Sequence, residues 1–181
     1  PTNINRQLIA MHSTVGKPKT QILAQRLLDI NPRLNIHIKQ LYMDEVQTEI
    51  LLDEAKYDYV IDAIDTISPK IALLTGCLKR KIKVISSMGA GGRIDPTRIA
   101  YADISETYHC ALAKAVRKRL KDAGISKGIK VVFSSEQPDR NAIIRTDEER
   151  NKKSTVGTIS YLPAIFGCYL AAYVIRKLSQ K

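Results

Sequence analysis

The sequence contains no tryptophan, and its aromatic residues are only eight tyrosines and two phenylalanines among 181 residues. So few rings argue against a protein that binds nucleic acid by stacking bases on an aromatic platform. Acidic residues are also in the minority, with 18 Asp and Glu against 29 Lys and Arg and a formal net charge of +11. This excess favours a polyanionic partner such as RNA. A basic protein with no such partner would have the same composition.

Cysteine is scarce, and Cys77, Cys110 and Cys168 are far apart with no Cys-x-x-Cys pair. A disulfide framework and a structural zinc site are therefore not expected. Neither is there a signal peptide, so we expect a reduced, cytoplasmic protein. The longest apolar region, 159–175, is interrupted by Pro163. At about 17 residues it is at the lower limit for a membrane span, and we expect a buried helix instead.

Strand-like and helix-like patterns alternate along the whole chain. Strands are expected at 34–38, 59–64, 84–87 and 130–133, and helices before Asn31-Pro32 and at 46–55, 69–81, 111–123 and 158–178. This alternation predicts an α/β fold, a Rossmann-like and mainly parallel sheet flanked by helices. We expect one domain over 1–181, in which the long polar segment 134–157 is a mobile loop on the substrate side.

The most informative stretch is 57–70, where an apolar run carries Asp62 inside it and Asp65 at its end, directly before a helix. In open α/β sheets, ligands bind at the carboxyl ends of the strands. We therefore expect Asp65 to face a nucleotide and its metal. Two plainer interpretations stay open: Asp65 as the N-cap of the following helix, and Asp62 as a hydrogen-bonded structural acid.

A second strand, 84–87, runs into a loop with three glycines, Gly89, Gly91 and Gly92. Glycines suit a tight turn. They also leave bare backbone that a substrate can approach closely, and the place of the loop at the expected ligand edge favours this second interpretation.

Several motifs occur together in a known arrangement. They are Asn3-Ile4-Asn5-Arg6-Gln7, Val15-Gly16-x-x-Lys19, Asp62-x-x-Asp65, Gly89-Ala90-Gly91-Gly92 and Ile94-Asp95-Pro96-Thr97. In this combination the chain resembles the adenylating superfamily that includes ubiquitin-activating enzymes and the adenylyltransferases of molybdopterin and thiamine biosynthesis. Within that superfamily it is similar to the tRNA threonylcarbamoyladenosine dehydratase branch, from residue 1 to about 178.

The resemblance implies ATP and Mg²⁺ as cofactors and assigns the residues that hold them. Cations would stabilise the triphosphate, and a hard oxygen ligand would hold the metal. By resemblance, Arg6, Lys19 and Asp65 are the catalytic residues, and Asp65 is the Mg²⁺ ligand. The nucleotide-binding residues would be Thr2, Asn3, Asn5, Arg6, Lys19, Asp65 and Thr66. Taken singly, Arg6 and Lys19 would fit solvated surface charges equally well.

A basic helix supplies the expected contact with tRNA. Its cations Lys114, Arg117, Lys118 and Lys121 follow the spacing i, i+3, i+4 and i+7, which places them on one helix face. Contact with the RNA backbone is one use of such a face, and simple solvation is the other. Cys110, at the start of this helix, would be stabilised there as a thiolate, although a dehydratase needs no covalent cysteine.

Members of the superfamily begin with a strand, a Gly-rich turn and a helix, and this first unit is missing from the sequence. We therefore expect a C-terminal part of a longer enzyme, which is inactive unless another chain supplies the missing unit. The resemblance also implies a homodimer. The leading hypothesis is an ATP-dependent dehydratase that cyclises threonylcarbamoyladenosine in tRNA through an acyl-adenylate. One alternative is adenylation of the C-terminus of a sulfur-carrier protein, with a sulfur-relay partner; the other is a non-catalytic, basic RNA-binding or dimerisation fragment.

Overall fold

A computed structural model describes residues 3–149 and 152–180, and the chain separates into two compact units, Pro1–Tyr42 and Met43–Lys181. The first unit contains a short 3-10 helix, His12–Thr14, and the helix α1, Lys19–Ile30. Pro18 stands at the N-cap position of α1, where a residue without an N–H costs no hydrogen bond. The helix ends at Asn31, as the Asn-Pro pair predicts.

The strand expected at 34–38 is wrong, since the structure forms no strand among residues 3–42. The alternation of apolar and polar residues is present, but a strand also needs a neighbour for its backbone groups. Leu34 and Ile38 are 40% and 45% exposed, so the expected buried side is not buried within this unit.

The second unit is built on a four-stranded sheet in the order β1-β2-β4-β3. Its strands are β1 (Val60–Asp62), β2 (Val84–Ser87), β3 (Ile99–Asp103) and β4 (Lys130–Ser134). β1, β2 and β4 are parallel, and β3 is antiparallel to β4, which confirms a mainly parallel sheet. β1 is an edge strand of this sheet, so Ile61 is 46% exposed where the apolar run predicted a buried strand.

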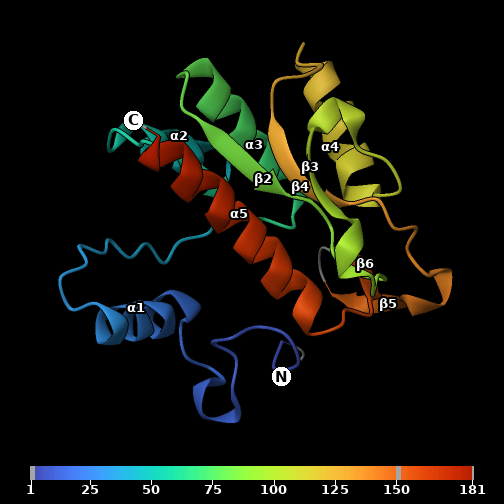
Figure 1. The fold of residues 1–181 in the computed structure, drawn as a ribbon, viewed down its shortest axis with the longest axis horizontal. Helices are drawn as coiled ribbons and strands as arrows, with labels where there is room; N and C mark the ends of the chain where they lie inside the picture. Colours follow the sequence, from blue (N-terminus) through green and yellow to red (C-terminus); the bar gives the residue numbers. More distant parts are fainter. Residues whose placement is uncertain (1–2, 150–151, 181) are drawn as a thin grey trace. The chain divides into compact units, whose positions relative to one another are not determined.

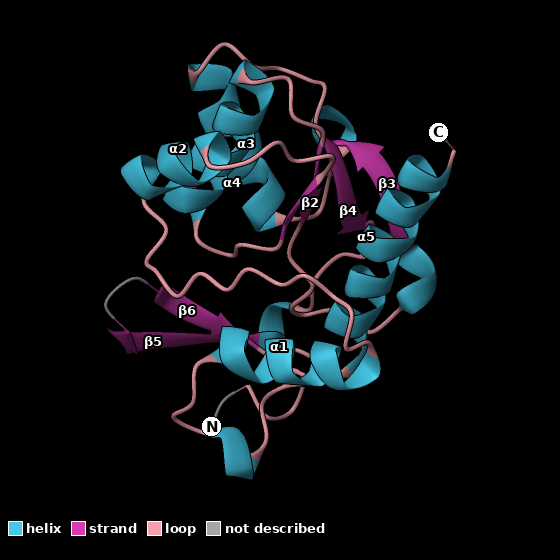
Figure 2. Ribbon diagram, turned by 90° about the vertical axis from the view of Figure 1, so that its left-hand side faces the viewer, coloured by secondary structure: helices cyan, strands magenta, loops and turns pink. Residues whose placement is uncertain are grey.

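Helices cover both faces of the sheet (Figures 1 and 2). On one face lie α2 (Glu45–Asp53), α3 (Ile67–Lys79) and α4 (Ala111–Asp122), and on the other lies α5 (Tyr161–Ser179). Two apolar clusters correspond to these layers. The larger one joins α3 and α4 to the sheet around Leu74, Val116 and Val131, and the smaller one joins α5 to it around Ile85 and Phe166.

The segment 134–157, expected as a loop, contains an antiparallel hairpin of β5 (Ile143–Glu149) and β6 (Lys152–Val156). The described part of the second unit also contains 3-10 turns at Pro96–Arg98, Ile104–Glu106 and Arg140–Ala142. α5 occupies most of the apolar region 159–175, whose length is near the lower limit for a membrane span. Of the helices formed by residues 3–149 and 152–180, none combines the length and apolarity needed to cross a membrane.

Candidate active site

The parallel strands end at one edge of the sheet, and the segments that follow them form the candidate site. β1 is followed by the linker 63–66, β2 by the loop 88–95 that carries the glycines, and β4 by Ser135 and Glu136. β3 begins at the same edge, because its first residue, Ile99, is paired with Ser134, the last residue of β4. This is the edge at which open α/β sheets bind ligands.

Asp62, the last residue of β1, is a buried structural acid. It is 1% exposed. Its Oδ1 accepts the Ile64 backbone N–H at 2.9 Å, and its Oδ2 accepts the Ser86 hydroxyl at 2.6 Å. The Asp62 side chain therefore ties the end of β1 to its own linker and to β2, as one of the two plainer interpretations anticipated.

Lys70 completes this arrangement from the first turns of α3. Its Nζ lies 2.7 Å from Asp62 Oδ2, with both side chains fully buried, and it donates to the Ile64 carbonyl oxygen at 2.7 Å. Burial lowers the pKa of the Lys70 ammonium, and the Asp62 carboxylate opposes that shift. Sequence reasoning missed Lys70, although an acid inside an apolar run signals a buried partner.

Asp65 and Thr66, both exposed, stand between β1 and α3. Thr66 occupies the N-cap position of α3, so the interpretation of Asp65 as the helix cap is wrong. The Thr66 hydroxyl lies 3.4 Å from Asp65 Oδ1. The described residues hold no group of three or more His, Cys, Asp or Glu side chains arranged so that it could bind a metal ion. One exposed carboxylate suits Mg²⁺, which usually takes one or two carboxylates together with phosphate oxygens and water.

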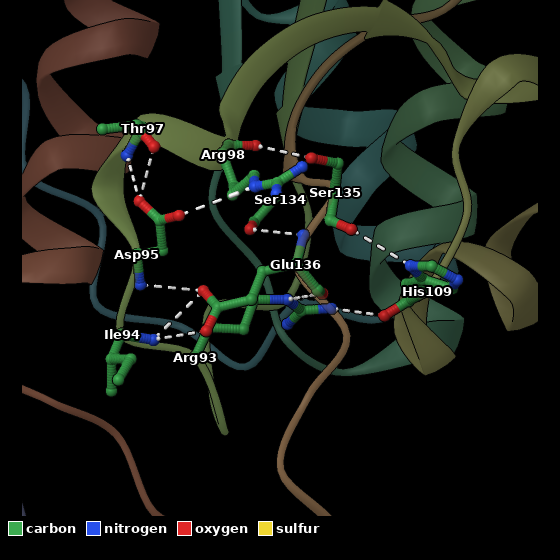
Figure 3. A network of polar contacts seen from close by, with 9 residues as sticks. All are labelled: Arg93, Ile94, Asp95, Thr97, Arg98, His109, Ser134, Ser135 and Glu136. Atoms are coloured by element: carbon green, nitrogen blue, oxygen red, sulfur yellow. Dashed lines mark hydrogen bonds and ion pairs between the residues drawn. The ribbon is translucent and has the colours of Figure 1, made fainter.

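Arg93 fixes the glycine loop from within, as Figure 3 shows in part. The residue is 3% exposed, and its guanidinium donates only to backbone carbonyls in the described contacts. The acceptors are Gly89 at 2.8 Å, Gly91 at 3.2 Å, Glu136 at 3.0 Å and His109 at 2.5 Å. This one side chain thus joins the loop after β2 to the end of β4 and to the residue before the N-cap of α4.

Carboxylates hold the rest of the loop (Figure 3). Glu136 accepts the backbone N–H groups of Ile94 at 3.1 Å and Asp95 at 2.8 Å. Asp95 in turn accepts from the backbone and hydroxyl of Thr97 at 2.8 and 2.6 Å. The Thr97 hydrogen bonds, ahead of the charge of Arg98, lower the pKa of the Asp95 carboxyl. The Ile-Asp-Pro-Thr motif is therefore the structured entry into β3.

The glycines of the loop lie close to other residues of this chain, whereas we expected their bare backbone to leave room for a substrate. A Cβ on Gly91 would lie 2.9 Å from Val156, and one on Gly92 would lie 3.1 Å from Pro138. Gly92 also has φ +72°, a conformation that other residues rarely adopt. Its N–H donates to the Gly157 carbonyl at 2.8 Å, so the loop packs against the segments flanking the β5–β6 hairpin.

In the first unit, the expected phosphate-binding residues lie near one another. The Arg6 guanidinium donates to the Asn5 and Asn3 side-chain oxygens, both at 2.9 Å. Asn3 and Lys19 line one hollow of about 240 Å³, together with Gly16. Thr2, the remaining expected residue, lies outside the described residues.

The basic face of α4 divides into one anchored and three exposed cations. Arg117 donates to the hydroxyl of buried Thr107, whereas Lys114, Lys118 and Lys121 are exposed. Cys110 is 6% exposed at the N-cap, where its Sγ accepts the Ala113 N–H at 3.4 Å. This contact gives Cys110 a structural role in starting the helix.

Comparisons with known proteins extend over the whole chain. The ThiF family matches residues 1–181. A tRNA threonylcarbamoyladenosine dehydratase of Bacillus subtilis is 41% identical, covering 98% of this chain and 72% of that protein. The Escherichia coli protein of that name is 32% identical, covering 99% and 73%. Its crystal structure in complex with ATP has a TM-score of 0.87, covering 99% of this chain and 71% of that chain.

The similarity to adenylyltransferases, the enzymes of the alternative hypothesis, is more limited. The Escherichia coli molybdopterin-synthase adenylyltransferase is 30% identical, but covers only 60% of this chain and 43% of that protein. The chain therefore belongs to the ThiF family, in the group whose members are named tRNA threonylcarbamoyladenosine dehydratases.

Proposed function

We propose that the protein is an ATP-dependent dehydratase that cyclises threonylcarbamoyladenosine in tRNA. The observation that carries the proposal is the end of β1, where the exposed Asp65 follows the buried Asp62–Lys70 pair, in a chain that matches dehydratases over 98% of its length. The match to an adenylyltransferase over 60% of the chain supports a shared first step, the adenylation of a carboxylate by ATP, and not a shared substrate.

The proposed reaction has two steps. A carboxylate oxygen of the threonylcarbamoyl group attacks the α-phosphorus of ATP, and the bond to the leaving pyrophosphate breaks. The carbamoyl group then attacks the acyl carbon of the adenylate, a ring closes, and AMP leaves with the oxygen that the substrate loses. One proton is released from the carbamoyl group. Because both reacting groups belong to the substrate, the protein's task is positioning and charge stabilisation.

Arg6 and Lys19 are the proposed phosphate ligands. Arg6 presents a planar fork of N–H donors, and Lys19 a compact charge that adapts to a phosphate oxygen. The side chains of Asn3 and Asn5 orient the guanidinium, since both accept hydrogen bonds from it. Thr2 and Thr66 are proposed as further nucleotide contacts on the strength of the family resemblance alone.

Asp65 is the proposed Mg²⁺ ligand, and its exposed carboxylate at the carboxyl edge of the sheet supports this role. When bound, Mg²⁺ would neutralise charge on the phosphate oxygens. Lys114, Lys118 and Lys121 are proposed to contact the tRNA backbone. We further propose a homodimer in the cytoplasm, where tRNA modification would take place. A sulfur-relay partner belongs to the alternative function, adenylation of a sulfur-carrier protein.

Asp65→Ala should lower AMP release from ATP and threonylcarbamoyl-modified tRNA about 100-fold or more, because it removes the metal ligand. The matched control is Asp58→Ala, which changes another exposed aspartate, just before β1. Circular dichroism should show both variants folded.

Two results would contradict the proposed function. Unchanged turnover in Asp65→Ala would remove Asp65 from the mechanism. Exchange of pyrophosphate into ATP that depends on a small protein ending in Gly-Gly, and is not stimulated by tRNA, would assign the chain to the adenylyltransferases.

A further inference from the structure

We infer that Lys70 is a positioning residue that fixes the peptide between Ile64 and Asp65 and so holds the Asp65 carboxylate at the carboxyl edge of the sheet. The inference rests on the proposed function of Asp65. It concerns a side chain that is completely buried.

Both backbone polar groups of Ile64 are held by the Asp62–Lys70 pair. The Ile64 N–H donates to Asp62 Oδ1 at 2.9 Å, and the Ile64 carbonyl accepts from Lys70 Nζ at 2.7 Å. That carbonyl belongs to the planar peptide bond leading into Asp65. Fixing it removes one rotational freedom from the backbone that carries the carboxylate.

The anchor for this peptide spans three elements. Asp62 ends β1, Lys70 lies in α3, and Ser86 of β2 donates to Asp62 Oδ2 at 2.6 Å. Since Lys70 and Asp62 are fully buried, solvent does not compete for these bonds. The linker 63–66 is therefore tied to two strands of the sheet and to α3, although Asp65 itself is exposed.

Stability alone gives little reason for an ion pair here. A buried pair is often no more stabilising than apolar residues of the same size, because both charges lose their hydration. An apolar pair could fill the same space, but it would offer no donor to the Ile64 carbonyl. Nor does the N-cap residue Thr66 add a side-chain hydrogen bond that would fix this end of α3.

The test separates the hydrogen bond that Lys70 donates to Ile64 from the charge of the Asp62 carboxylate. In Asp62→Asn, Lys70 can still donate to Ile64; in the double variant D62N/K70M it cannot, while the amide oxygen introduced at position 62 still accepts from Ile64. We expect the single variant to lose stability, because it leaves the buried Lys70 without its carboxylate partner, but to keep the wild-type Mg²⁺ dependence and exchange of 63–66, because the Lys70 amine still donates to Ile64. In the double variant, the Mg²⁺ concentration for half-maximal ATP binding should rise about tenfold. Hydrogen exchange of the segment 63–66 should accelerate by a similar factor, with tRNA affinity unchanged.

Arg80→Met is the matched control at the other end of α3. It removes a cation paired with Glu49 at 2.6 Å and Asp53 at 2.7 Å, and should change neither readout. Lys70→Gln is the second variant in case the double variant does not fold. Its side chain is one atom shorter, so it cannot reach both acceptors, and it should shift both readouts in the same direction.

Normal Mg²⁺ dependence and normal exchange in either folded Lys70 variant would overturn the inference. That result leaves the proposed function intact if the wild-type protein releases AMP with modified tRNA. Conversely, a wild-type protein that binds ATP and Mg²⁺ but releases no AMP overturns the proposed function, while binding and exchange still decide the role of Lys70.

Discussion

Cys168 differs from the other two cysteines in its surroundings, and this difference decides its reactivity. Cys168 is exposed on α5, whereas Cys77 and Cys110 are buried. Burial raises the pKa of the Cys77 thiol to about 11. At pH 8 only about one Cys77 thiol in a thousand is therefore ionised, and the thiolate is the reactive form.

We predict that a disulfide reagent at pH 8 labels one thiol rapidly in the folded protein and all three after unfolding. Cys168→Ser should abolish the rapid phase, which is followed by absorbance of the released thiolate. Cys110→Ser, in which serine also makes a good N-cap, should retain the rapid phase. A rapid phase that persists in Cys168→Ser would contradict the assignment.

Residue identity alone selected one candidate for the site. Asp65 could be selected because an acid at the end of an apolar run, directly before a helix, marks a ligand edge. Lys70, Arg93 and Glu136 could not, since their roles depend on which backbone carbonyls and amides fold against them. Long-range contacts of this kind leave no local pattern in a sequence.

Elements with an apolar face were predictable. β2 has the expected bounds, 84–87, and α3 and α4 lie within two residues of theirs because each contributes to the larger core. The β5–β6 hairpin was missed, since its sequence is polar and charged and gives no apolar alternation. The unpaired segment 34–38 shows the opposite error, a strand pattern without a neighbouring strand.

The packing of the glycine loop can be tested by the stability of glycine variants. Gly92 and Gly124 both have positive φ, +72° and +77°, but only Gly92 is crowded, by Pro138. Gly124→Ala should lower the free energy of unfolding by about 1 kcal/mol through backbone strain. Gly92→Ala adds crowding and should lower it by about 2 to 3 kcal/mol.

Urea denaturation of the two glycine variants beside the wild-type protein measures both losses. The comparison isolates the contact between the loop and the segment before the hairpin, because the conformational strain is common to both positions. Equal losses in the two variants would mean that this contact does not restrict residue 92.

At the scale of the whole molecule, the net charge of +11 must be separated from the basic face of α4. A general excess of cations binds any polyanion, and every cation near a phosphate contributes to the salt dependence. A defined binding face instead makes some lysines matter much more than others. Net charge alone cannot distinguish these cases, since both give strong binding at low salt.

We therefore predict different outcomes for two triple variants that lose the same charge. Changing Lys114, Lys118 and Lys121 to Gln should weaken tRNA binding and reduce the slope of log affinity against log salt by about 2 to 3, as for three lost phosphate contacts. The control variant changes Lys56, Lys79 and Lys83, which are also exposed but lie on other segments. It should keep nearly the wild-type slope. Filter binding across a salt series measures both, and equal effects of the two variants would show that the overall charge, and not α4, determines tRNA binding.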